Sequence, residues 1–395
     1  MFIGESLINI RILNELSRSE LAKKLDITEQ AVWQYENGYV TPKLDIINKM
    51  KSLFKVKSGY FLKDDLIEQK HFNNIKIERI AYRSEFMNTA IKTQSELIHV
   101  KFLDALLKKV TKKITFPKNE IMILRDQVLE FLNKSDSHMQ RSQQISYVAK
   151  IARKRLGLPI DNNKNLVFYL EKAGAFIIEK SIGDTIDAYS VWSEDDTPYI
   201  ILGNIKKSAV RRNFDLAHEL GHLLLHYKTE FNMLDRENYK LKEEEANTFA
   251  SEFLMPATPF SEDISTLTRV SNPKSYLELK KKWLVSIQAM GLRVRSLDLM
   301  SYQQLRYFFI SINKYGYKKR EPLDDKIPID KPMKIKSIFK LLFEKEVLTL
   351  QGLMDEIKVD LEFLSMITGI ETAFFEKYLI DQFQSFSIDD LKIVE

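Results

Sequence analysis

Apolar side chains recur every three or four positions along most of this chain, which is the period of a helix with one buried face. Between residues 61 and 155 they form two stripes on either side of Pro117. The stripes contain Leu97, Val100, Leu103, Leu106, Leu107 and Val110, and then Ile121, Leu124, Val128, Leu129, Phe131 and Leu132. This spacing predicts two long connecting helices, and neither carries residues that suggest chemistry.

Three short segments interrupt the helical period. Residues 175–178, 188–192 and 199–202 are apolar, β-branched or aromatic, and bounded by Gly, Asp or Pro, as is typical of strands. Helical spacing returns in residues 246–254, and Pro256 is expected to end that helix. The predicted fold class is therefore mainly α with a small β-sheet (α+β).

Length and composition limit the class of protein. A chain of 395 residues suggests two to three domains, and 44% apolar residues suffice for buried cores. Because there is no Cys, any metal has to be held by His and carboxylate side chains. Residues 1–6 do not resemble a secretory signal, and no apolar run approaches the ~18 residues that a membrane helix requires. We therefore expect a cytoplasmic protein that makes no membrane contact.

Three of the six His residues lie within residues 218–226. His218-Glu219-Leu220-Gly221-His222 is an H-E-x-x-H sequence, and on a helix this spacing places both imidazoles on one face, ~6 Å apart. The pattern predicts that His218 and His222 bind a catalytic Zn²⁺ and that Glu219 is the general base. The alternative is a buried helix that contains two His and a Glu by coincidence.

The third metal ligand is less obvious from the pattern. His226 lies eight residues past His218, so an unbroken helix would place it ~12 Å along the axis and about 80° around it. We expect His226 instead near the helix C-terminus, where a cationic side chain suits the dipole. Glu245 immediately precedes the apolar stripe of the next helix, which makes it the favoured ligand. Glu243 and Glu244 are expected to be solvated acids of the first turn.

The run from Phe214 to Pro256, with H-E-L-G-H, E-E-A-N-x-F-A and L-M-P, resembles the ImmA/IrrE family of zinc metallopeptidases. Upstream, Gly157–Ile160, Leu170–Gly174, Ile186–Ser190 and Pro198–Leu202 match the usual lead-in. The resemblance implies a zincin-like domain with an H-E-x-x-H endopeptidase site of the gluzincin kind. It also implies that Glu245, the Glu before Ala-Asn, is the third zinc ligand.

A second signal lies at the N-terminus. Ser19 is expected to cap a short helix with Leu21, Ala22 and Leu25, and Thr28 to cap a second that Gly38 ends. Two short helices joined at residues 26–28 predict a helix-turn-helix. Residues 5–60 resemble the phage-repressor (XRE) type, which implies a five-helix domain.

By that resemblance residues 28–36 form the recognition helix, and Arg11 and Glu36 form a structural ion pair. Gln30 and Gln34 match positions that reach base edges, where Gln can pair bidentately with adenine. The full candidate DNA-contacting set is Thr28, Glu29, Gln30, Trp33, Gln34 and Asn37. The resemblance also implies a homodimer that reads a two-fold operator.

Two features of this segment favour a different role. Trp33 stands where small polar residues are usual, and its indole could alter groove docking or contact a protein. Residues 1–60 hold nine Lys or Arg against seven Asp or Glu, a net charge of only +2. DNA readers normally carry a clearer basic surface. A helical module that binds another protein is therefore the alternative.

The C-terminal third of the chain contains two segments of opposite net charge. Residues 269–320 have a net charge of +10 and residues 321–395 a net charge of −7. The lysines at 280–282, followed by a Ser286 cap, suggest two short helices whose basic face is either simply solvated or contacts phosphate. The acidic tail could dock on this basic module or bind a partner, and the sequence leaves both open.

These observations predict five segments. They are a helix-turn-helix domain at 1–62, a helical connector at 63–140, a metallopeptidase core at 141–262, a basic helical module at 263–320 and an acidic helical tail at 321–395. The leading hypothesis is an intracellular regulator that cleaves a protein, by the resemblance a DNA-bound helix-turn-helix repressor. The alternative is a non-catalytic DNA-binding regulator, or antitoxin-like protein, whose peptidase fold is a sensor. Glu219 favours the enzyme, because a sensor does not need a general base.

Overall fold

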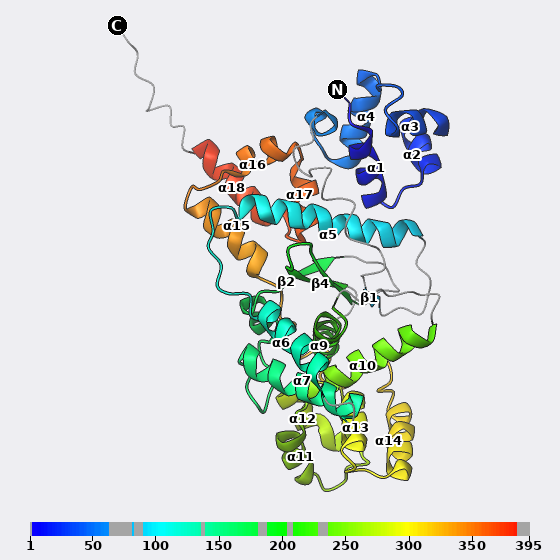
Figure 1. The fold of residues 1–395 in the computed structure, drawn as a ribbon, viewed down its shortest axis with the longest axis vertical. Coiled ribbons are helices and arrows are strands. Elements are labelled where there is room, and N and C mark those ends of the chain that lie inside the picture. Colours follow the sequence, from blue (N-terminus) through cyan, green and yellow to red (C-terminus); the bar gives the residue numbers. More distant parts are fainter. Residues whose placement is uncertain are drawn as a thin grey trace. The chain divides into compact units, whose positions relative to one another are not determined.

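The computed structural model describes residues 2–62, 81–82, 90–135, 139–180, 188–203, 208–227 and 236–384 (Figure 1). The chain divides into two compact units. The first comprises Met1–Ile77, Phe86–Thr115 and Lys334–Glu395, and the second comprises Glu78–Glu85 and Phe116–Met333. Helices dominate both, and the second holds a small sheet, so the predicted α+β class is confirmed. No helix in the described residues is long and apolar enough to cross a membrane.

The N-terminal segment of the first unit contains five helices, as predicted. They are α1 Gly4–Leu13, α2 Arg18–Leu25, α3 Glu29–Glu36, α4 Leu44–Phe54 and the 3₁₀ helix η1 Ser58–Phe61. The expected cap at Ser19 is wrong. Ser17 begins α2, because the spacing of Ser17 and Glu20 forms a capping box in which each side chain satisfies the other residue's backbone N–H.

The turn between α2 and α3 has the geometry of a helix-turn-helix. Asp26 adopts a left-handed conformation with φ 59°, and the Thr28 hydroxyl accepts a hydrogen bond from the Ala31 N–H at 3.1 Å. The predicted Arg11–Glu36 ion pair is confirmed at 2.5 Å, and Arg18 also binds Glu36. The Glu36 side chain is fully buried between the two guanidinium groups, which fixes α3 against α1 and α2.

The C-terminal helices complete this same unit. They are α15 Lys334–Glu344, α16 Leu350–Ile357, α17 Leu361–Thr368 and α18 Thr372–Gln384, together with the long α5 Ala90–Val110. Val56 forms an antiparallel bridge with Val359, and the Lys57 ammonium lies 2.5 Å from the Asp355 carboxylate. Helices α5 and α17 are in contact. The Phe102 ring of α5 meets the Phe363 ring of α17 edge-on, with 5.7 Å between the ring centroids.

This grouping differs from the predicted acidic tail domain at 321–395. Residues 334–384 pack against the helix-turn-helix segment and α5, whereas residues 321–333 belong to the second unit. Local spacing carries no information about pairs such as Lys57 and Asp355, which lie 298 residues apart.

The second unit begins with α6 Glu120–Lys134, α7 Arg141–Leu156 and α8 Leu166–Lys172. Its sheet contains β2 Phe176–Lys180, β3 Ala188–Trp192, β4 Pro198–Gly203 and the short β1 Ala81–Tyr82, in the order β1-β3-β4-β2. β4 is parallel to β2 and antiparallel to β3, with Ile200 opposite both Ile177 and Ser190. The three strands expected from the apolar runs are therefore present.

The H-E-x-x-H residues and the three neighbouring glutamates of this unit lie on two helices, α9 Ala209–Leu225 and α10 Arg236–Leu254. α9 packs against β3 and β4, and α10 packs against α9 and α7. Nearly every side chain from Asp215 to Leu225 is buried. Ile121, Leu124 and Val128 of α6 belong to the same core, so the helix predicted as part of a connector is part of the peptidase-like fold.

The basic region extends this core. It contains α11 Ala257–Ser265, η4 Pro273–Tyr276, α12 Leu277–Trp283, α13 Ile287–Ser296 and α14 Tyr302–Lys314. The predicted Ser286 cap is confirmed, since its hydroxyl accepts a hydrogen bond from the Ala289 N–H at 3.1 Å. Trp283, Met290 and Phe308 are fully buried in the core cluster.

The lysines at 280–282 do not form a free basic surface. Lys280 is fully buried, and its ammonium binds Glu321 at 2.8 Å and Asp324 at 2.7 Å. Lys281 pairs with Glu278, and Lys282 pairs with Asp263. The sequence pattern could not show this, because the acids that bind Lys280 are about 40 residues further along the chain. Lys280 is therefore not available to phosphate.

Replacement of Lys280 by Met should destabilise the second unit by about 3–5 kcal/mol, because it leaves two carboxylates buried without their shared cation. Lys281→Met is the matched control and should change stability by about 0–1 kcal/mol, since its pair with Glu278 is exposed. Denaturant unfolding followed by tryptophan fluorescence measures both, since Trp192 and the buried Trp283 lie in this unit. Equal stability of the two variants would contradict a structural role for the Lys280 pair.

Candidate metal centre

Helix α9 brings two imidazoles together on one face. His218 and His222 are one turn apart, their Nε2 atoms are 2.9 Å apart, and both side chains are buried. The flanking leucines at 216, 220, 223 and 224 are 2% exposed or less, so they hold the helix in the core while the two rings face α10. This is the arrangement that the H-E-x-x-H spacing predicts.

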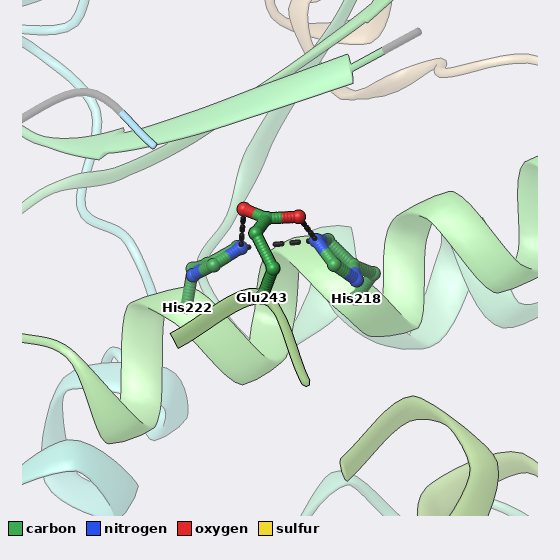
Figure 2. Close-up of side chains that lie close together, drawn as sticks. All are labelled: His218, His222 and Glu243. Atoms are coloured by element: carbon green, nitrogen blue, oxygen red, sulfur yellow. Dashed lines mark hydrogen bonds and ion pairs between the residues drawn. The ribbon is translucent and has the colours of Figure 1, made fainter. Parts of the chain in front are cut away.

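The carboxylate that meets these rings is Glu243 of α10 (Figure 2). Its Oε2 lies 3.4 Å from His218 Nε2, and its Oε1 lies 3.2 Å from His222 Nε2. The ligand atoms of the three residues all lie within 4.8 Å of one another, as a single bound cation requires. The expectation that Glu243 is a solvated acid is therefore wrong.

Glu245, the ligand expected from the resemblance, lies elsewhere. Its carboxylate accepts two hydrogen bonds from Arg141, at 2.8 and 2.7 Å, and its Oε2 is 3.0 Å from His226 Nε2. Two residues along a helix correspond to a rotation of about 200°, so Glu243 and Glu245 project in different directions. Position 243 lies on the same helix face as the buried Ala246 and Ala250, which follow three and seven residues later. This spacing is the sequence feature that could have identified Glu243 as the inward-facing carboxylate.

The other ring nitrogens also have defined partners. His218 Nδ1 lies 3.0 Å from Asn247 Oδ1, and His222 Nδ1 lies 2.9 Å from His226 Nδ1. An amide oxygen can only accept, so His218 carries its proton on Nδ1 and presents an Nε2 lone pair to His222 and Glu243. An imidazole lone pair and a carboxylate that converge in a buried site can together bind a cation. His and carboxylate side chains are typical ligands of Zn²⁺.

Both acidic side chains beside the imidazoles have lowered pKa values. Burial raises the pKa of Glu243, but its contacts with His218 and His222 outweigh burial and lower that pKa to about 2. Burial likewise raises the pKa of Glu245, and Arg141 and His226 lower it to about 2. Both carboxylates are therefore charged at neutral pH.

His226 is the C-cap residue of α9, as its position predicts, but the expected cationic role is wrong. Burial lowers its pKa to about 4, and this effect outweighs the opposing contact with Glu245. His226 is therefore neutral at pH 7, and it lies on the Nδ1 side of His222 and not on the Glu243 side.

Glu219 is fully buried on α9, between the two His of the motif. Its Oε2 accepts a hydrogen bond from the Ser190 hydroxyl at 2.7 Å, and that hydroxyl also lies 3.2 Å from the Glu219 backbone oxygen. Ser190 belongs to β3, so the sheet orients the carboxylate of the predicted general base. Sequence reasoning did not assign Ser190, although it lies in a segment that matches the family lead-in.

The predicted DNA-contacting residues all lie on or beside α3. Thr28, Glu29, Gln30, Trp33 and Asn37 are exposed, and Gln34 is half-buried. The Trp33 ring is 42% exposed and stacks on Tyr39 at a centroid distance of 5.2 Å. Among the described residues, the exposed face of α3 thus has an aromatic pair at its end.

Comparison with protein families matches both parts of the chain. Residues 7–61 match the model of a helix-turn-helix, and residues 170–295 match the model of the IrrE N-terminal-like domain. No curated protein matches the sequence. A solved structure, a transcriptional regulator from Mycobacterium tuberculosis, is similar at 15% identity and a TM-score of 0.28, over 44% of this chain and about half (52%) of that one.

These matches define the class of protein. The predicted fusion of an XRE-type helix-turn-helix with an ImmA/IrrE-like domain is confirmed. The chain combines a DNA-binding type of domain with a metallopeptidase-like fold. The IrrE-like match extends to residue 295, so it includes α12 and α13 of the region predicted as a separate basic module.

Proposed function

We propose that this chain is a zinc-dependent endopeptidase that its helix-turn-helix domain directs to a protein substrate on DNA. The observation that carries the proposal is the convergence of His218, His222 and Glu243 beside the buried Glu219. His218, His222 and Glu243 are the residues that would hold the metal. A zinc ion bound there would supply a Lewis acid that lowers the pKa of a water molecule.

The side chains of the site have separate roles in this proposal. Glu219 accepts a proton from the attacking water and passes it to the leaving amine of the cut peptide bond. Ser190 keeps the Glu219 carboxylate oriented through its 2.7 Å hydrogen bond. Asn247 holds the Nδ1 proton of His218. The buried leucines around the motif keep bulk water from competing for these groups.

The combination of the two domains supports a proposal for the substrate class. A helix-turn-helix places the peptidase-like unit near proteins that occupy operators, and we propose that the substrate is a helix-turn-helix repressor bound there. A non-catalytic sensor would need the metal ligands but not a buried, oriented Glu219, so this residue favours the enzyme.

Metal removal tests the proposed activity. Purified full-length protein is expected to contain about one zinc per chain and to cleave a repressor encoded beside its own gene when the two are co-expressed. A strong chelator should abolish cleavage, and added Zn²⁺ should restore it. Zinc content without any cleavage of co-expressed helix-turn-helix proteins would favour the sensor.

A separate prediction concerns DNA binding by the helix-turn-helix. Gln30→Ala and Gln34→Ala should each cost about 1–3 kcal/mol at particular base pairs and leave non-specific binding nearly unchanged. Asn48→Ala, on the exposed side of α4, is the control and should bind as the parent does. Selection from random DNA followed by footprinting measures this, and a homodimer should protect half-sites about one helical turn apart. If no sequence is enriched, the exposed Trp33 and Tyr39 are better explained as a protein-docking surface.

A further inference from the structure

Behind His222 lies a continuous chain of polar side chains that the proposed mechanism does not use. His222 Nδ1 is 2.9 Å from His226 Nδ1, His226 Nε2 is 3.0 Å from Glu245 Oε2, and Arg141 donates to both Glu245 oxygens. The two imidazoles are buried, and the Glu245 side chain is 11% exposed. Only Arg141, at 41%, reaches solvent.

The proton positions along this chain follow from what each atom can donate or accept. The Glu245 carboxylate accepts hydrogen bonds from Arg141 at both oxygens, so in its 3.0 Å contact with His226 it also accepts, and the proton of that contact lies on His226 Nε2. With its ring proton on Nε2, His226 presents a lone pair at Nδ1. The facing nitrogen, His222 Nδ1, must supply the proton of that contact. His222 Nε2 is left with a lone pair, directed to the side on which Glu243 and His218 lie.

This result coincides with what a metal ligand needs. A neutral His binds a metal through the nitrogen without a proton, and a hydrogen bond at the other nitrogen selects that tautomer and fixes the ring. Different neighbouring side chains therefore determine the tautomers of His218 and His222. His218 is held by the neutral Asn247 amide, whereas His222 is held by an imidazole that a charged carboxylate polarises.

We infer that His226 and Glu245, anchored by Arg141, are positioning residues that hold His222 in its metal-binding tautomer and orientation. This inference rests on the proposed zinc site. It gives Glu245 a role one step removed from the metal, in contrast to the ligand role that the family resemblance implies for it. His226 acts as the bridge between Glu245 and the ligand.

Zinc affinity of the full-length protein, measured by competition with a chromophoric chelator, tests the inference. Glu245→Gln and His226→Phe should each weaken zinc binding about 10–100-fold, the range typical of residues behind a metal ligand. Glu244→Gln is the matched control, because Glu244 is an exposed neighbour on the same helix. It should bind zinc as tightly as the parent protein.

A readout without metal separates positioning from general structural support. In the ¹⁵N spectrum of the metal-free protein, the His222 signals should show the proton on Nδ1, and Glu245→Gln and His226→Phe should shift that population. The metal-free melting temperature should change little in Glu245→Gln. If His226→Phe fails to fold, Arg141→Met replaces it, because it removes the anchor of Glu245 at the exposed end of the chain.

The outcomes distinguish the inference from the proposed function. Unchanged zinc affinity in Glu245→Gln, with zinc bound by the parent protein, overturns the inference and leaves the zinc site intact. Complete loss of zinc in Glu245→Gln, equal to that of His218→Ala, also overturns it, because Glu245 would then be a ligand. Absence of zinc binding by the parent protein overturns the proposed function itself.

Discussion

Glu219→Gln is expected to retain its zinc and to lose about 10²–10⁴-fold in peptidase activity, the usual contribution of a general base. The substitution keeps the size of the side chain and its ability to accept a hydrogen bond from Ser190, so the buried packing of α9 should persist. It removes the group that takes the proton from water. Cleavage rate and zinc content, measured on the same purified sample, give the result.

Two outcomes would contradict this role for Glu219. Unchanged cleavage would remove Glu219 from the mechanism and require another base. Loss of zinc together with activity would mean that Glu219 itself holds the metal, although the convergent set in the described residues is His218, His222 and Glu243. Ser190→Ala should give a smaller loss of cleavage, because it removes the support of the carboxylate and not the carboxylate.

Changes to the proposed metal ligands should have the second large effect. His218→Ala is expected to abolish zinc binding, because it leaves one imidazole and one carboxylate. Glu243→Gln should weaken binding by more than the ~100-fold upper range for residues behind a ligand, because it removes the negative charge within 3.4 Å of both Nε2 atoms. Equilibrium dialysis against buffered zinc measures both affinities.

The controls for the ligand set lie on the same helix. Glu244→Gln should leave zinc affinity unchanged, and Glu245→Gln should give an intermediate loss. The expected order is therefore Glu244 unaffected, Glu245 weakened and Glu243 most weakened. A reversal in which Glu245→Gln exceeds Glu243→Gln would restore the ligand set first expected from the resemblance.

The sequence predicted the elements that depend on local chemistry. Thr28 and Ser286 begin helices because their hydroxyls satisfy backbone N–H groups three residues on, and such caps can be recognised in the sequence. The spacing of His218 and His222 likewise predicted the two adjacent rings. The cap of α2 was misplaced by two residues, because Ser17 and Ser19 both precede the apolar stripe and only Ser17 has Glu three residues later.

The parts that could not be predicted depend on contacts between distant segments. Glu243, Glu244 and Glu245 are chemically identical neighbours, and the packing of α10 on α9 decides which of them meets the imidazoles. In the sequence, Lys280 lies in a run of lysines that is typical of a surface, and only the fold places Glu321 and Asp324 beside it. In each case the relevant partner is 20 or more residues away, beyond the reach of helical periodicity.

The division of the chain has a consequence for synthesis. No segment of the first unit interrupts residues 116–333 of the second unit. The first unit, which holds the helix-turn-helix, needs residues 334–384 to complete its packing. Domains generally fold as units while the chain emerges from the ribosome. The unit that contains His218 and Glu243 can therefore acquire its structure before Val359 is available to pair with Val56. During production of each molecule, the unit with the H-E-x-x-H helix can fold before the unit with the helix-turn-helix is complete.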